Sequence, residues 1–111
     1  MMILYGISNC DTVRKARKFL ESAGHSFQFH DFRKDGLSTE TILTWLTYTD
    51  YSDLINKRST TWKQLSNSEQ AAIDDQDLTL LTQHPTLIKR PVLQLDQRLL
   101  IGFKLEEYQN L

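Results

Sequence analysis

The sequence predicts an α/β fold in which a β-α-β unit, a block of helices and a β-β-α unit follow one another. Three observations support this prediction. Two short segments rich in β-forming residues flank a helical pattern near the start, and several short helical patterns fill the middle of the chain. Two further short strands and a last helical pattern complete it. A length of 111 residues suits a single domain with one core.

The first unit begins with an apolar strand that starts at Ile3 and ends in a polar turn. A helix follows the turn, because Val13, Ala16 and Leu20 recur three or four residues apart and form one apolar stripe. A second strand is expected over residues 26–30, where phenylalanine alternates with polar residues. A strand, a helix and a strand within about 30 residues form a right-handed unit whose strands are parallel.

A helical insertion is expected at about residues 37–84, after a turn over residues 33–36. Polar residues of the types that cap helices mark the starts of its helices, at Ser38, Ser52, Ser66 and Asp77. Glu69, three residues after Ser66, completes a capping box. Residues 57–62 are interpreted as a polar connection that ends in a buried tryptophan. Because no linker composition marks either end of this block, residues 1–111 are expected to form a single domain.

Residues 89–95 predict a strand with Pro91 at its start, where a missing backbone N–H is tolerated. A tight turn then leads into residues 98–101, which are the expected antiparallel partner, and a last helix is expected over residues 104–110. Together these elements make an α/β sandwich of thioredoxin type. Its sheet is mixed and four-stranded, and the helical insertion lies between the second and third strands.

Cys10 is the only cysteine and lies where the first loop meets the first helix. The free N–H groups and the positive dipole end of a helix N-terminus stabilise a thiolate, which raises reactivity at neutral pH. The same N–H groups can hold an oxyanion. A lone cysteine can instead be a small buried hydrophobe. An exposed loop tip is favoured here by four polar neighbours, which are Ser8, Asn9, Asp11 and Thr12.

Composition excludes several classes of function. The net charge of −1 gives no electrostatic basis for binding nucleic acid or an anionic membrane. No apolar run approaches the roughly 20 residues of a membrane span, and the first residues lack the features of a signal peptide. The three histidines show no metal-ligand spacing, so no metal site is expected. A single cysteine cannot form an internal disulfide, so we expect a reducing, cytoplasmic location.

Four motifs occur in order along the chain: Tyr5–Thr12 with the helical Arg14–Ala16, Arg58–Trp62, Lys89–Pro91 and Ile101–Phe103. Together they resemble the arsenate-reductase (ArsC/Spx-type) family, and in particular its small YffB-like subgroup. The resemblance covers essentially the whole chain and implies a thioredoxin-like fold with a helical insertion. It also implies a nucleophile at Cys10, anion-binding arginines at Arg58 and Arg90, and a cis peptide bond before Pro91.

The chemistry of these residue types agrees with that implication. A guanidinium is a planar fork of donors that fits an oxyanion or a carboxylate, and its charge also favours a nearby thiolate. Asn9 and Thr12 can hydrogen-bond the sulfur or a bound anion, and Asp11 stands with them at the helix start. Helix capping is the alternative role for Asn9 and Thr12, and for Asp11 it is a favourable charge at the helix N-terminus. For the two arginines the alternative is a solvated surface charge.

Two departures from the family pattern bear on the substrate. The family's arsenate reductases place a histidine four residues before the nucleophile, where this sequence has Gly6. They also have a third anion-binding arginine after the last hairpin, where this sequence has residues 101–103, and Arg98 lies too early to replace it. Losing a charged donor to an oxyanion costs orders of magnitude in rate. A glutathione mixed disulfide fits better, because its carboxylates can pair with Arg58 and Arg90 while its sulfur meets Cys10.

The first hypothesis is therefore a glutathione-dependent thiol reductase, an enzyme that acts as a monomer without a tightly bound cofactor. Glutathione is its expected co-substrate, and glutaredoxin is a further partner that the resemblance implies. The alternative is an arsenate reductase that depends on glutathione and glutaredoxin. A second alternative is a non-catalytic Spx-like transcription regulator that binds RNA polymerase. Spx-type regulators commonly carry Cys-x-x-Cys, and Val13 at the second position excludes an internal dithiol switch here.

Overall fold

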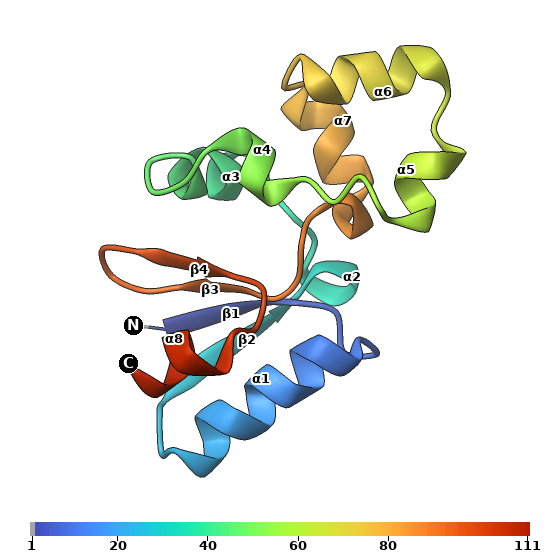
Figure 1. The fold of residues 1–111 in the computed structure, drawn as a ribbon. Coiled ribbons are helices and arrows are strands. Elements are labelled where there is room, and N and C mark those ends of the chain that lie inside the picture. The colour runs from blue at the N-terminus through green and yellow to red at the C-terminus, as the bar shows by residue number, and fades with distance from the viewer. Residues whose placement is uncertain (1) are drawn as a thin grey trace. The chain divides into compact units, whose positions relative to one another are not determined.

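The computed structural model of the chain describes residues 2–111, which form two compact units (Figure 1). The first unit contains the residues up to Asp35 together with Arg90–Leu111, and the second contains Gly36–Lys89. The second unit corresponds to the helical insertion predicted at about residues 37–84 and extends a few residues beyond it. That the two units make up one domain stays a prediction.

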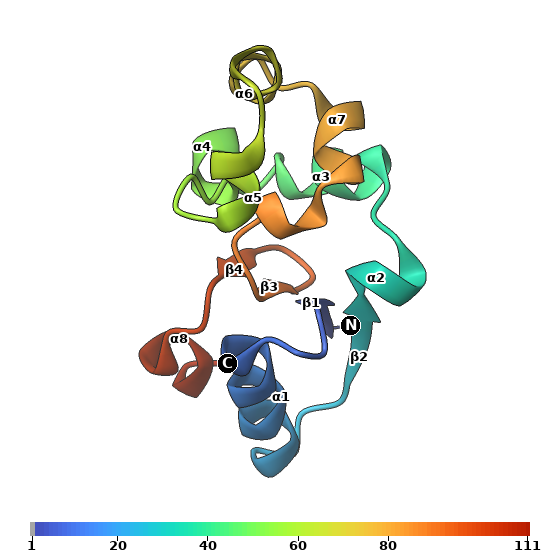
Figure 2. The same cartoon turned by 90° about the vertical axis from the view of Figure 1, so that its right-hand side faces the viewer.

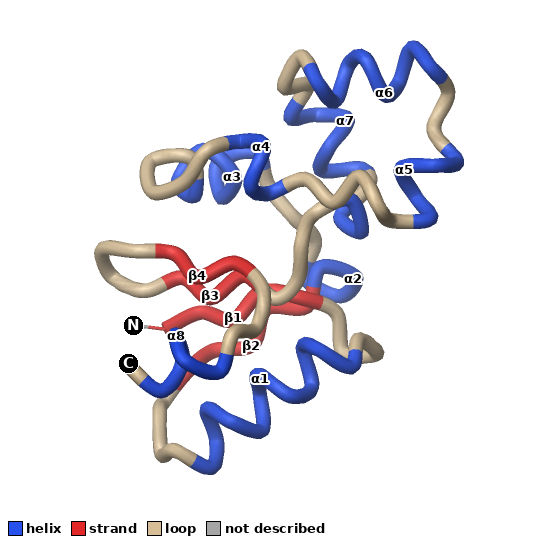
Figure 3. The backbone as a smooth tube through the Cα atoms, in the orientation of Figure 1, coloured by secondary structure: helices blue, strands red, loops and turns tan. Residues whose placement is uncertain are grey.

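The first unit is built on a mixed four-stranded sheet, drawn in red in Figure 3. In chain order its strands are β1 (Met2–Gly6), β2 (Phe27–Asp31), β3 (Val92–Gln94) and β4 (Leu99–Ile101). The spatial order is β2-β1-β3-β4, with β2 parallel to β1, and with β3 antiparallel to both β1 and β4. Helix α1 (Asp11–Ser22) connects the parallel strands, and α8 (Leu105–Gln109) follows β4. The predicted α/β fold of thioredoxin type is confirmed.

An apolar core joins this sheet to α1 and α8, which lie on the same side of it (Figure 2). Its buried members are Leu4, Ala16, Leu20, Leu93, Leu100 and Tyr108. The strand register places Leu4, Leu93 and Leu100 in one row across the sheet. Burying a leucine side chain stabilises the fold by about 1.5–3 kcal/mol. The row therefore sets the position of α1 on the sheet, and with it the position of the residue before α1.

The second unit is helical. Its helices are α3 (Thr39–Trp45), α4 (Tyr51–Leu54), α5 (Thr60–Gln64), α6 (Asn67–Asp74), α7 (Leu78–Gln83) and the 3-10 helix η1 (Pro85–Leu87). Two backbone hydrogen bonds join its middle to its end: Asn56 N–H donates to Leu87 O at 2.7 Å, and Lys89 N–H donates to Leu54 O at 2.8 Å. None of the helices within residues 2–111 combines the length and apolar character that crossing a membrane requires.

Three of the predicted helix caps are confirmed. Ser38 accepts a hydrogen bond from the Thr41 N–H, and Asp77 accepts one from the Leu80 N–H. The capping box of Ser66 and Glu69 forms in both directions at the start of α6. These caps could be predicted because each depends on residues only three positions apart in the chain.

Other predictions for the second unit and its approach are wrong. Residues 33–36 are not a turn throughout, because α2 occupies Phe32–Asp35. Asp50 rather than Ser52 is the residue before α4. The polar connection at 57–62 contains the start of α5, capped by Ser59, and its Trp62 is only half-buried. These helices are a single turn or little more, too short for an apolar period to be read from the sequence.

The last two strands are shorter than predicted. β3 begins after Pro91, and the peptide bond between Arg90 and Pro91 is cis, the geometry that the resemblance implied. At the other end of the strand, the Leu95 N–H donates to Arg98 O at 2.9 Å and closes the hairpin turn. Gly102, with φ +77°, directly follows the last residue of β4.

Candidate functional site

Cys10 is the residue immediately before α1, at the end of a short loop that leaves β1. Its backbone is extended, with φ −104° and ψ 125°, and its carbonyl accepts the first helical hydrogen bond from Arg14 N–H at 2.9 Å. Its side chain is partly exposed, forms no disulfide and caps none of the helix N–H groups. The thiol therefore stands at the amino end of a 12-residue helix, where the dipole favours a negative charge.

The cysteine loop and the Arg90–Pro91 segment meet at one edge of the sheet. β1 ends at this edge, and β3 begins there because the two strands are antiparallel, with Tyr5 paired to Val92. Pro91 therefore lies beside the start of the loop that leads to Cys10. The carbonyl of Pro91 also accepts a hydrogen bond from the Gly102 N–H at 2.8 Å, which ties the end of β4 to the same place. The structure thus brings Arg90 and Cys10 to a common edge, as an anion site would require.

The polar residues around Cys10 are engaged with arginines. Asp11 forms an ion pair with Arg14 one turn further along α1, and both side chains are exposed. The Asn9 side-chain oxygen accepts a hydrogen bond from Arg33 Nη1 at 3.4 Å. Thr12 is exposed in the first turn of the helix. Three of the predicted site residues, Asn9, Asp11 and Thr12, therefore surround the thiol at the surface.

Arg58 belongs to the second unit, so its action together with Cys10 stays a prediction. The side chain is exposed, and its backbone N–H donates to Asn56 Oδ1 at 3.1 Å. It stands directly before Ser59, which caps α5 through a bond from the Trp62 N–H at 3.1 Å. The start of α5 is therefore well defined, and the arginine before it projects from an ordered backbone.

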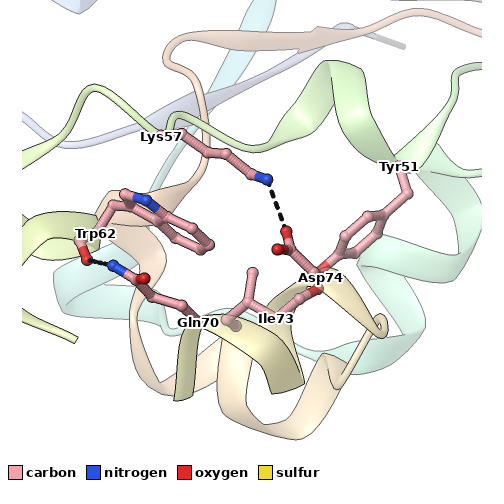
Figure 4. A network of polar contacts seen from close by, with 6 residues as sticks. All are labelled: Tyr51, Lys57, Trp62, Gln70, Ile73 and Asp74. Atoms are coloured by element: carbon pink, nitrogen blue, oxygen red, sulfur yellow. Dashed lines mark hydrogen bonds and ion pairs between the residues drawn. The ribbon is translucent and has the colours of Figure 1, made fainter. Parts of the chain in front are cut away.

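A polar network anchors the residue next to Arg58 (Figure 4). The Lys57 ammonium forms an ion pair with Asp74 at 2.8 Å and lies 5.0 Å from the centre of the Trp62 ring. The Trp62 carbonyl in turn accepts a hydrogen bond from Gln70 Nε2 at 2.8 Å. At exposed sites a cation–π contact contributes about 0.5–1 kcal/mol and an ion pair about 0–1 kcal/mol. The network holds the 57–58 segment against α6.

Tyr51 forms the other end of the network and donates a hydrogen bond from its hydroxyl to the carbonyl of Ile73. Burial of the ring, together with the charges of Asp74 and Asp77, raises the pKa of Tyr51 to about 12. The side chain is therefore a neutral hydrogen-bond donor at physiological pH.

A buried carboxylate lies beneath the cysteine loop. Asp31, the last residue of β2, is only 5% exposed and pairs in register with Gly6 of β1. Burial alone would raise its pKa, but hydrogen bonds from the N–H groups of Arg33, Lys34 and Ser8 and from the Ser8 hydroxyl outweigh that effect. The pKa of Asp31 is therefore lowered, and the side chain is charged at neutral pH.

The sequence reasoning missed Asp31 and Arg33, because the end of β2 was interpreted only as a strand and a turn. A signal was available in the predicted topology. Parallel strands end at the same edge of a sheet, so polar residues after the second strand must lie near the loop after the first. Asp31 ends β2 and Arg33 comes shortly after it, while Cys10 follows β1.

Close packing explains why glycine occupies position 6, four residues before the cysteine. A Cβ atom built at Gly6 would lie 2.7 Å from Val13 Cγ2, closer than real Cβ contacts occur. The end of β1 therefore needs glycine in order to pack against the first turn of α1.

Within residues 2–111 no group of three or more histidine, cysteine, aspartate or glutamate side chains could hold a metal ion.

A thioredoxin-like sheet, a single thiol before the first helix and a cis-proline before the third strand define the class of protein. The chain belongs to the ArsC family, whose family model matches residues 5–111. Within that family it is similar to the small YffB-like members. A solved structure of a protein named YffB superposes with a TM-score of 0.91 at 33% sequence identity, and the match covers 99% of this chain and 97% of that one.

Two relatives show the range of the family. An uncharacterized protein of Haemophilus influenzae is 43% identical over 110 residues, which is 98% of this chain and 96% of the relative. A protein of Lactiplantibacillus plantarum described as the global transcriptional regulator Spx is 31% identical over 118 residues, 99% of this chain and 85% of the relative. The chain is therefore similar over nearly its whole length to a protein described as a regulator.

Proposed function

We propose that this chain is a thiol reductase that depends on glutathione and uses Cys10 as its nucleophile. The observation that carries the proposal is the place of the thiol, partly exposed at the amino end of α1 and at the same sheet edge as Arg90. Membership of the ArsC family supports an oxidoreductase. The helix end and the guanidinium both favour a thiolate and an anionic substrate group.

The reaction is a pair of thiol–disulfide exchanges on a mixed disulfide of glutathione. The Cys10 thiolate attacks the glutathione sulfur, the disulfide bond breaks, and the substrate thiolate leaves and takes a proton from water. Cys10 is then joined to glutathione by a disulfide. A second glutathione, as its thiolate, attacks the glutathione sulfur of this adduct, releases oxidised glutathione and restores the Cys10 thiolate. The net reaction reduces one mixed disulfide and oxidises one glutathione.

Arg90 and Arg58 would bind the carboxylates of glutathione, and Asn9 and Thr12 would offer hydrogen bonds beside the sulfur. Asp11 is paired with Arg14 and so contributes less negative charge next to the thiolate than a lone carboxylate would. Arg33 adds a further cation at the same edge through its contact with Asn9. Several guanidinium groups suit a ligand that carries two carboxylates.

Arsenate reduction by the same thiol is the alternative reaction. The close approach of Gly6 and Val13 weighs against it, because it leaves no room for the histidine that the family's arsenate reductases place there. The second alternative, a non-catalytic regulator that binds RNA polymerase, is supported by the relative described as Spx.

The deciding experiment measures reduction of a glutathionylated peptide by glutathione, in the presence of the wild-type chain and of Cys10→Ser. We expect the wild type to accelerate the exchange and the variant to lose the acceleration. Full activity of Cys10→Ser, or no acceleration by the wild type, would refute the proposal. The same preparations assayed with arsenate, glutathione and glutaredoxin test the alternative reaction. A pull-down with purified RNA polymerase tests the regulator.

A further inference from the structure

The tip of the loop that carries Cys10 is not buried, although Ile7 at its start is only 6% exposed and belongs to the core. Ser8 and Asn9 are both exposed, and within the loop the Cys10 N–H makes only a long hydrogen bond, 3.4 Å, to the carbonyl of Ile7. Exposed loop tips move unless hydrogen bonds or packing hold them. The stabilisation that a helix end offers a thiolate falls off within the first turn. The reactivity of Cys10 therefore depends on what holds the loop in place.

The loop is held from the neighbouring strand. The Asp31 carboxylate accepts hydrogen bonds from both the backbone N–H and the hydroxyl of Ser8, two residues before Cys10. Asp31 is the one charged or polar residue in the buried class among residues 2–111. Hydrogen bonds to a buried charge are stronger than neutral ones, and leaving such a charge unpaired is costly. Releasing Ser8 would therefore take away two of the hydrogen bonds that keep Asp31 charged.

Asp31 is itself fixed on several sides. Its Oδ1 accepts the Arg33 N–H at 2.8 Å, and its own N–H donates to Asp35 Oδ2 at 3.1 Å. Because the Asp31 carboxylate orders the backbone of Arg33, it also sets the start of the side chain that reaches Asn9. The corner that follows β2 thus contacts the cysteine loop at Ser8 and at Asn9.

We propose that Asp31 is a positioning residue for Cys10, which holds the thiol at the amino end of α1 by binding Ser8. The proposal rests on the proposed function, because it assigns to Asp31 the task of keeping the nucleophile of that reaction in place. Asp31 touches neither the sulfur nor a substrate. It acts through the loop.

A positioning role for Asp31 and a purely electrostatic role predict changes of opposite sign in the reaction rate of Cys10. Asp31 carries a negative charge near the thiol, so Coulomb's law alone says that removing this charge favours the thiolate and speeds its reactions. If the carboxylate acts by holding the loop, removing the charge lets the thiol leave the helix end and slows its reactions. The sign of the change therefore distinguishes the two effects.

The experiment measures the rate at which Cys10 reacts with iodoacetamide at pH 7 in the folded full-length chain. Asp31→Asn keeps the size of the side chain and removes its charge, whereas Ser8→Ala removes one donor and changes no charge. The matched control is Asp35→Asn, which removes a charge from the same corner while its amide oxygen can still accept the Asp31 N–H. Urea unfolding, together with kcat and KM for the glutathionylated peptide, is measured for every variant.

We expect Asp31→Asn to lower the alkylation rate by about two- to fivefold, the size of a helix-end effect, and Ser8→Ala to lower it by about twofold. The loss should fall on kcat rather than on KM, and Asp35→Asn should react at the wild-type rate. A rate for Asp31→Asn at or above the wild-type rate overturns the proposal, as does an equal loss in Asp35→Asn.

Two outcomes need separate treatment. If Asp31→Asn does not fold, Ser8→Ala decides, because Ser8 is exposed and its truncation leaves the core intact. An unchanged rate in Ser8→Ala then overturns the proposal. If the wild type shows no turnover, the proposed function fails, whereas the alkylation rates need no turnover and still decide whether Asp31 positions the thiol.

Discussion

Substituting Gly6 by alanine should destabilise the protein through one identified clash. The added Cβ would lie 2.7 Å from Cγ2 and 3.1 Å from Cγ1 of Val13. Val13 is fully buried, and valine in a helix strongly prefers one rotamer, so its methyl groups cannot turn away. Forcing a methyl group into a packed core costs about 1–3 kcal/mol, and alanine in a strand recovers about 0.5–1 kcal/mol relative to glycine. We therefore expect a net loss of about 1 kcal/mol.

The assay is urea unfolding followed by circular dichroism, on Gly6→Ala, Val13→Ala and the double variant. Val13→Ala alone should cost about 2 kcal/mol, because it removes buried methyl groups and leaves a cavity. In the double variant the new methyl group enters that space, so the combined loss should fall short of the sum by about 1 kcal/mol.

Gly24→Ala is the matched control for this cycle. Gly24 has φ +77° and nothing within 4 Å of an added Cβ, so its substitution strains only the backbone. Its cost should add to that of Val13→Ala within about 0.5 kcal/mol. If Gly6→Ala is as stable as the wild type, or if its cost simply adds to that of Val13→Ala, the clash is not what requires glycine at this position.

Three further predictions concern the site and the polar network. Arg90→Ala should slow turnover of the glutathionylated peptide at least tenfold with little loss of stability. Arg98→Ala, in the exposed hairpin turn, should change neither turnover nor stability. Equal losses of rate and stability in Arg90→Ala would make Arg90 structural. The lowered pKa of Asp31 contributes stability that is present above about pH 4 and is lost as pH falls through the lowered pKa. Urea unfolding of Asp31→Asn should therefore depend less on pH below about 4, and an unchanged slope contradicts this. The pKa of Tyr51, raised to about 12, contributes stability below about pH 10 that is lost as pH rises through 12. Tyr51→Phe should therefore cost about 1 kcal/mol at pH 7, through the lost hydrogen bond to Ile73. Its stability should fall less steeply than that of the wild type between about pH 10 and 12. Equal dependence of stability on alkaline pH in the two proteins would refute this assignment.

The order of elements could be predicted from the sequence because each depends on short-range patterns. The stripe of Val13, Ala16 and Leu20 predicted α1, and all three residues are buried in the structure. The caps at Ser38 and Ser66 involve hydrogen bonds across three residues. In contrast, α2, α5 and the true start of α4 were missed, since a helix of one turn has no period to detect.

Some features of the candidate site could likewise be predicted from the sequence, and others could not. The position of Cys10 before α1 could be predicted, because a strand, a polar turn and a helix are consecutive in the chain. The close approach of Gly6 and Val13, and the hydrogen bonds between Asp31 and Ser8, could not, because they depend on how α1 and β2 pack beside β1.

By itself, the sequence determined that this protein has a thioredoxin-like α/β fold and one thiol at the start of its first helix. Only the tertiary structure decided what surrounds that thiol. Strand pairing joins residues more than 20 positions apart, such as Gly6 and Asp31, and the register of that pairing is set by the burial of whole strand faces. No short stretch of the chain contains that information.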